Sequence, residues 1–176
     1  MDSDDIWPED HLAAHFAAMS RDPELMLRGT SAEIIDVHGE SLGIRRVVHE
    51  NRLAERLLIR NVFIHSSIMF RRDVALSVGG YDGNMETLED LHLCLRIAQQ
   101  GKIENDSSRS IRYRIHDGQL SRTRSSAYSL GQVRRERFSL AKHLGIGRLR
   151  ARAMAASWEI YERTPRSWRR KFLRRV

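Results

Sequence analysis

The chain has 176 residues, enough for one domain with a sizeable core, and its 41% hydrophobic and 30% charged residues are ordinary for a globular protein. No apolar run approaches the length needed to cross a bilayer, and the acidic first residues do not resemble a secretory signal. The single cysteine, Cys94, excludes an internal disulfide framework and a Cys-rich zinc site. We therefore expect a cytoplasmic protein with one buried thiol.

The net charge of +7 is divided unevenly along the chain. Residues 1–108 hold 11 Lys/Arg against 19 Asp/Glu, a balance of −8, whereas residues 109–176 hold 19 against 4, a balance of +15. An acidic body with a basic C-terminal part indicates two roles, or one body and one surface anchor. The basic part would attract anionic lipid, diphosphate or nucleic acid.

Helices and short strands alternate in the expected order of elements. A helix is predicted from Pro8 to Asp22, followed by two short strands at 25–27 and 33–37 that are interrupted by Gly29-Thr30-Ser31. The later elements are a helix at 51–59, a buried strand at 65–70, a brief helix at 74–78, a clear helix at 88–100 capped by Gly101, a strand at 111–115, and helices at 126–143 and 147–163. This order predicts an α/β domain, with few strands for a self-sufficient sheet.

The acidic run Asp2-Ser3-Asp4-Asp5 is the first group with a chemical interpretation. Its carboxylates repel each other unless a cation or hydrogen-bond donors lie among them. Hard oxygen ligands of this kind suit Mg²⁺ or Mn²⁺, which also bind substrate phosphates. The alternative is a solvated acidic segment that caps the following helix.

Glu89-Asp90 forms a second group, at the start of the helix predicted from residue 88. The helix dipole stabilises a carboxylate there, and such a group can act as a general base if it reaches a substrate hydroxyl. Plain helix capping is the alternative.

Two further segments contain candidate site residues. His116 follows a predicted strand and precedes a turn, a position that suits a ligand or an acid–base group, although most single histidines are structural. The Gly79-Gly80 pair allows positive φ angles and close approach of the backbone to a ligand, or forms an ordinary turn.

Taken together and in chain order, these segments resemble the family 2 glycosyltransferases of the GT-A type. The resemblance covers residues 2 to about 122. The segments that carry it are Asp2-Ser3-Asp4-Asp5-Ile6-Trp7, His65-Ser66-Ser67-Ile68-Met69-Phe70-Arg71-Arg72, Gly79-Gly80-Tyr81-Asp82, Glu89-Asp90-Leu91-His92-Leu93-Cys94-Leu95-Arg96 and Tyr113-Arg114-Ile115-His116.

The resemblance implies an inverting transfer of a sugar from a nucleotide-diphospho-sugar to a hydroxyl of a saccharide or lipid-linked acceptor. By analogy, Asp2, Asp4 and His116 would bind the diphosphate and a Mg²⁺ or Mn²⁺ ion, with Asp4 as a direct ligand. Asp90 would be the general base, supported by Glu89. The residues assigned to the donor or acceptor pocket are Trp7, His65, Gly79, Gly80 and Asp82.

The match departs from the family pattern in one respect. Members of the family have an earlier apolar strand, of the type Val-Ile-Ile-Pro, and an Asp-Asp-Gly-Ser segment, and the chain has neither. We therefore expect the C-terminal portion of a GT-A domain at 1–122, inactive or incomplete as an isolated chain, and a basic helical extension at 123–176. The alternative is a non-catalytic remnant that binds a partner through this basic C-terminal part.

Residues 163–176 interleave arginines with Trp168 and Phe172. This mixture fits a helix at a membrane surface, at the inner face of the membrane for a cytoplasmic protein. Nucleic acid is the rival partner, which we favour less, and a solvated helix face is the third interpretation.

Overall fold

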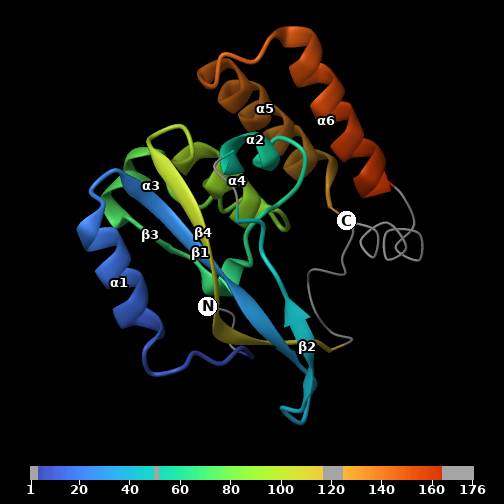
Figure 1. Cartoon of the computed structure of the whole chain (residues 1–176). Coiled ribbons are helices and arrows are strands. Elements are labelled where there is room, and N and C mark those ends of the chain that lie inside the picture. The colour runs from blue at the N-terminus through green and yellow to red at the C-terminus, as the bar shows by residue number, and fades with distance from the viewer. Residues whose placement is uncertain (1–3, 50–51, 117–124, 164–176) are drawn as a thin grey trace.

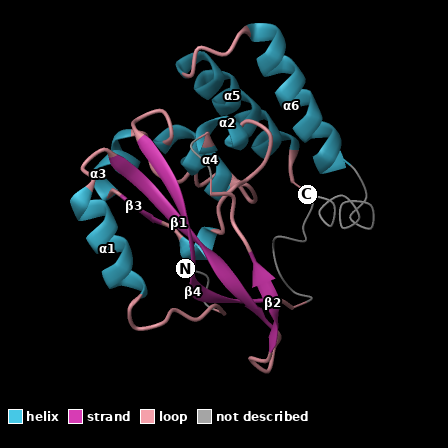
Figure 2. Cartoon of the chain, in the orientation of Figure 1, coloured by secondary structure: helices cyan, strands magenta, loops and turns pink. Residues whose placement is uncertain are grey.

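The computed structural model describes residues 4–49, 52–116 and 125–163, and these residues form a mixed α/β structure with a four-stranded sheet (Figure 1, Figure 2). The elements in chain order are α1 (His11–Arg21), β1 (Leu25–Ile35), β2 (Ser41–Arg45), α2 (Leu53–Leu57), the 3-10 turn η1 (His65–Ser67), β3 (Met69–Phe70), α3 (Arg72–Ser77), α4 (Glu89–Ile97), β4 (Lys102–Arg114), α5 (Ala127–His143) and α6 (Arg148–Arg163). The predicted α/β class is confirmed.

Strand β1 is the centre of the sheet. It pairs with β4 in parallel along its whole length, from Leu25 opposite Lys102 to Ile35 opposite Arg114. On its other edge, β3 pairs with the first half of β1 and β2 pairs with the second half, both antiparallel. Two parallel neighbours need a crossover connection, and the segment that contains α2, α3 and α4 supplies it. The C-terminal ends of β1 and β4 therefore lie next to each other, with Ile35 opposite Arg114.

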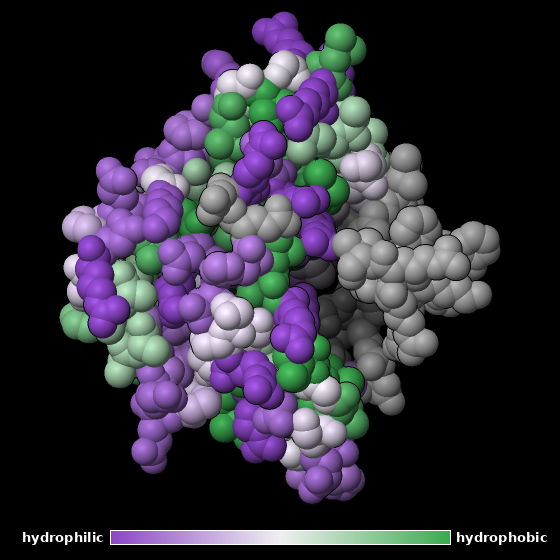
Figure 3. Space-filling view, in the orientation of Figure 1, coloured by the Kyte–Doolittle hydropathy of each residue, from purple (hydrophilic) through white to green (hydrophobic). Residues whose placement is uncertain are grey.

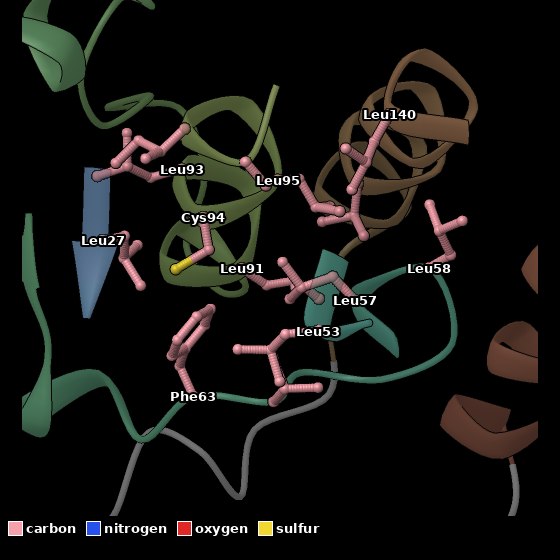
Figure 4. Packing of buried hydrophobic residues seen from close by; sticks show 14 of the residues in the cluster. Leu27, Leu53, Leu57, Leu58, Phe63, Leu91, Leu93, Cys94, Leu95 and Leu140 are labelled. Atoms are coloured by element: carbon pink, nitrogen blue, oxygen red, sulfur yellow. The ribbon is translucent and has the colours of Figure 1, made fainter. Parts of the chain in front are cut away.

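The main hydrophobic core lies between β1 and α4 and continues into the C-terminal helices. Leu27 of β1 faces Leu93 and Cys94 of α4, and α2 and α5 close the other side (Figure 4). The same cluster includes Leu140 of α5 and Trp158 of α6. The thiol of Cys94 is buried, as predicted. The predicted domain boundary at residue 122 lies outside the described residues and stays a prediction.

The helices were predicted well because apolar residues recur along them at helical spacing. The two C-terminal helices, α5 and α6, are confirmed, and each begins one residue after its predicted start. The Ser126 hydroxyl caps α5 by accepting the Ser129 N–H at 3.1 Å. The prediction that Gly101 caps α4 was wrong, because the helix ends at Ile97 and Ala98 is its cap. Gly101 is required for space instead, since a Cβ there would lie 2.8 Å from Cγ of Met26.

Three strand predictions are corrected by tertiary contacts. Residues 25–35 form one continuous strand, because Gly29 lies under Phe63 and Asn105 with no room for a side chain. Residues 65–70 form a 3-10 turn and only two strand residues, because the Ser67 hydroxyl donates to the carbonyls of Thr30 and Ile64 at 3.0 and 2.8 Å. Strand β4 begins at Lys102 rather than at residue 111.

Candidate functional site

The acidic segment at the start of the described chain lies against the end of β4. The backbones of Ile6 and Arg112 form an antiparallel bridge, with N–H to O distances of 3.0 and 2.9 Å. The strand pairing between β1 and β4 places His116 just beyond this bridge. A loop from the beginning of the chain and a strand end from its middle therefore form one structural unit.

Asp4 and His116 are in direct contact within this unit. The Nε2 of His116 lies 2.9 Å from Oδ2 of Asp4, and the two side chains are 34% and 31% exposed. Their exposure leaves a ligand access to both groups. Asp2, the third residue predicted for this site, lies outside the described residues.

Arg114 fixes the backbone that carries Asp4. Its Nε donates to the carbonyl of Asp4 at 2.9 Å, and one terminal nitrogen donates to the carbonyl of Asp36 at 2.7 Å. Its backbone N–H donates to Oδ1 of Asp5 at 2.8 Å, and Asp5 is buried. Strand β4 therefore holds the backbone that carries the Asp4 carboxylate.

Trp7 joins the acidic segment to two other elements. Its indole N–H donates to the carbonyl of Ser66 at 2.8 Å, and its ring stacks on His11 of α1 at 4.4 Å between centroids. The next histidine on this face, His15, is fully buried, and burial lowers its pKa to about 4. Burial also lowers the pKa of His11. Both imidazoles are therefore neutral near pH 7, and they serve as packing rather than as cationic groups.

The predicted pocket residues His65, Gly79 and Gly80 lie near one another. The Tyr81 hydroxyl is 3.5 Å from Nε2 of His65, and the two rings meet edge to face. Gly79 and Gly80 have φ angles of +92° and +63°, conformations that glycine adopts without strain. The Arg96 guanidinium of α4 donates to the carbonyls of Val78 and Gly80, so the glycine loop is held against α4.

Asp82, at the end of the same loop, is held by Asn84 and by helix α5. One carboxylate oxygen accepts the Asn84 N–H at 2.9 Å, and the other accepts the Tyr128 hydroxyl of α5 at 2.8 Å. These bonds, with the Asn84 N–H as the largest cause, lower the pKa of Asp82. The Asp82 carboxylate in turn raises the pKa of Tyr128. The loop is therefore tied to a helix that lies beyond the part of the chain covered by the family resemblance.

Glu89 and Asp90 lie in the first turn of α4, as predicted. Asp90 accepts a 3.0 Å hydrogen bond from the side-chain N–H of Asn61, whose carbonyl oxygen accepts the Phe63 N–H at 3.1 Å. The second bond fixes which end of the Asn61 amide faces Asp90. The residue before the pair, Leu88, has a φ of +65°, a conformation that is costly for a branched side chain and is concentrated at functional sites.

These contacts connect all five sequence segments into one continuous region. The segment that ends in His116 contacts the acidic segment, and Trp7 of the acidic segment contacts the 3-10 turn η1. Tyr81 of the glycine loop contacts η1, and Arg96 of α4 binds the same loop. No sequence signal pointed to Asn61 or Tyr128, because neither belongs to a recognisable motif. Within the described part of the chain, no group of three or more His, Cys, Asp or Glu side chains is arranged to hold a metal ion.

The chain is similar to glycosyltransferases of known name, although no model of a known protein family matches it. It is 32% identical over 120 residues to the O-antigen biosynthesis glycosyltransferase WbnJ of Escherichia coli, over 66% of this chain and 46% of the relative. It is 28% identical over 142 residues to the amylovoran biosynthesis glycosyltransferase AmsE of Erwinia amylovora, over 80% of this chain and 53% of the relative. The chain spans about half the length of these curated relatives.

Proposed function

We propose that the chain is the C-terminal portion of an inverting, family 2 glycosyltransferase with a GT-A fold, which transfers a sugar from a nucleotide-diphospho-sugar to an acceptor hydroxyl. The observation that supports this most is the contact between Asp4 and His116, which unites the first and last of the five resembling segments at 2.9 Å. The similarity to two named glycosyltransferases supports the same class.

The proposal assigns a Mg²⁺ or Mn²⁺ ion to Asp4 and His116, with Asp2 as a further ligand. The donor chemistry fits: carboxylate oxygen binds both ions, and an imidazole nitrogen beside it favours Mn²⁺ over Mg²⁺. When bound, the ion would offset the charge that develops on the departing diphosphate. Arg114 would keep the Asp4 carboxylate in place through its bonds to the backbone.

Asp90 is the proposed general base. Because Asn61 holds Oδ2, Oδ1 is the oxygen that would take the proton from the acceptor hydroxyl as that hydroxyl attacks the anomeric carbon. Glu89 would contact the acceptor beside it. The pocket around the sugar would be formed by Trp7, His65, Gly79, Gly80 and Asp82. Two contacts support this grouping: Trp7 bonds to the carbonyl of Ser66 beside His65, and His65 meets Tyr81 beside the glycine pair.

The acceptor, a saccharide or a lipid-linked saccharide, and a membrane contact through residues 163–176 belong to the same proposal. Only Arg163, the last residue of α6, falls within the described part of that segment. No helix in the described ranges combines the length and the apolar character needed to cross a bilayer.

A hybrid enzyme tests the catalytic assignment. The stretch of the E. coli relative that aligns with this chain is replaced by the chain, and release of nucleoside diphosphate from a set of nucleotide-sugars is measured with Mn²⁺ and saccharide acceptors. We expect turnover by the hybrid, a fall of roughly 10²–10⁴-fold on Asp90→Asn, and little change on the exposed control Asp73→Asn. Equal rates for Asp90→Asn and the parent hybrid would contradict the role of Asp90.

The isolated chain is assayed in parallel. The proposal expects no transfer from it, because the family pattern assigns nucleotide binding to segments that it does not contain. Turnover by the isolated chain that Asp90→Asn abolishes would retain the enzyme class and overturn the expectation of inactivity.

A further inference from the structure

The turn between α5 and α6 presents apolar and basic side chains side by side. We call residues 142–152 the α5–α6 corner. Leu149, at 84%, is the most exposed large hydrophobic side chain of the described residues, and Leu144 before it is also exposed. Lys142, Arg148 and Arg152 are exposed around them. In Figure 3, hydrophobic and hydrophilic residues alternate at the top of the molecule, where α5 turns into α6 in Figure 1.

The backbone of the corner is fixed before any partner arrives. Gly145, with φ +68°, ends α5 in a Schellman motif: its N–H donates to Lys142 at 3.1 Å, and the Ile146 N–H donates to Ala141 at 2.8 Å. Ile146 packs against the hydrophobic core, while Leu144 on the other side of the glycine faces outward. Because the turn is already ordered, binding through it costs little conformational entropy.

The charge of this region has one sign. Residues 137–158 include five Lys or Arg and no Asp or Glu. Of the basic side chains at the corner, Arg150 faces Glu55 of α2 at 3.8 Å. Lys142, Arg148 and Arg152 are thus exposed positive charges within a few residues of the two exposed leucines, Leu144 and Leu149. An anionic surface with an apolar layer beneath it is complementary to such a patch, because headgroups pair with the cations and acyl chains accept the leucines.

We propose that the α5–α6 corner docks onto an anionic lipid bilayer, with Leu144 and Leu149 inserted at the headgroup boundary and Lys142, Arg148 and Arg152 at the lipid phosphates. Nucleic acid would use the same cations but would gain less from exposed leucines, which neither stack on bases as aromatic rings do nor form hydrogen bonds with them. This surface is separate from residues 163–176 and does not depend on the glycosyltransferase assignment.

Sedimentation with vesicles tests the proposal on the full chain. We expect binding to mixed phosphatidylglycerol and phosphatidylcholine vesicles, weakened by salt, and far less binding to phosphatidylcholine alone. Leu149→Ser should weaken binding about tenfold, given the transfer free energy of a partly inserted leucine. Arg148→Gln with Arg152→Gln should weaken it about 25-fold, at about fivefold for each charge. The control is Leu76→Ser, an exposed leucine of α3 at 57%, which should bind as the parent does.

Three results would overturn the proposal. The first is parent-like vesicle binding by both corner variants, which would place the contact elsewhere, as in residues 163–176. The second is no binding of the parent chain to anionic vesicles. The third is binding to short duplex DNA that the arginine variants lose and Leu149→Ser retains. Thermal melting of each variant verifies that these substitutions at exposed positions leave the fold intact.

Discussion

The Nε2 of His116 lies 2.9 Å from Oδ2 of Asp4, although 112 residues separate them in the chain. The contact depends on the pairing of Ile6 with Arg112 and on the bond from Arg114 to the Asp4 carbonyl. One strand end therefore supplies the histidine and also positions the carboxylate that faces it. Substitutions at either residue act on the same small unit.

Removal of either side chain should weaken Mn²⁺ binding. We expect His116→Ala and Asp4→Asn each to lower the Mn²⁺ affinity more than tenfold, because each removes a direct donor from a site with few protein ligands. Calorimetric titration with Mn²⁺ alone measures this. His38→Ala, at an exposed histidine of the β1–β2 turn, is the matched control and should not change the affinity. Equal affinities in the parent and in all three variants would contradict the assignment.

Gly79→Ala should destabilise the fold. A side chain at φ +92° is strained, and the new Cβ would also lie 3.3 Å from the Arg96 guanidinium that holds the loop. The expected loss in the free energy of unfolding is about 1–2 kcal/mol, the cost of the left-handed conformation for a residue with a Cβ. Urea unfolding measures it.

Gly83→Ala provides the comparison for Gly79→Ala. No heavy atom lies within 4 Å of a Cβ at Gly83, and its φ is outside the left-handed range. The free energy of unfolding should therefore change by no more than about 0.5 kcal/mol. Similar losses for the two alanine variants would show that the glycine loop is not held as the structure describes.

The stability of the chain should fall as the pH drops from 6.5 towards 4, in part because of His15. Burial lowers its pKa from 6.5 to about 4, so in this window the unfolded chain binds a proton that the folded chain does not. Stability from this residue is complete above pH 6.5 and is lost as the pH approaches 4.

The change in slope identifies the contribution of His15. His15→Gln should flatten the dependence of the urea midpoint on pH between 6.5 and 4, whatever its effect at pH 7. His38→Gln, at an exposed position, should leave the slope as it is. An unchanged slope in His15→Gln would mean that His15 is not buried as a neutral group.

Tyr128→Phe should raise the pKa of Asp82. The Tyr128 hydroxyl donates to the carboxylate and so favours the charged form, and its removal leaves the Asn84 N–H as the larger remaining cause of the lowered pKa. Carboxyl-carbon NMR titration measures the change. The carboxyl of Asp36, held by the backbone N–H groups of Glu40 and His38, titrates in the same sample and should not move. If the pKa of Asp82 is the same in Tyr128→Phe and in the parent chain, the hydrogen bond that joins α5 to the glycine loop is contradicted.

The helices, the α/β class and the candidate motif residues follow from the sequence alone. Helices depend on contacts three and four residues apart, so the spacing of apolar residues along 127–163 is enough to place them. The positive φ angles of Gly79 and Gly80 were also predictable, because glycine is the residue that adopts them without strain.

The strands and the assembly of the site depend on contacts between distant parts of the chain. β1 continues through Gly29-Thr30-Ser31 because Phe63, Asn105 and Ser67 from distant segments contact it there. The sequence around residues 29–31 does not predict these contacts. The hydrogen bonds from Asn61 to Asp90 and from Tyr128 to Asp82 are likewise contacts between distant segments. These hydrogen bonds join residues tens of positions apart in the chain, and the pairing of β1 with β4 brings His116 to Asp4.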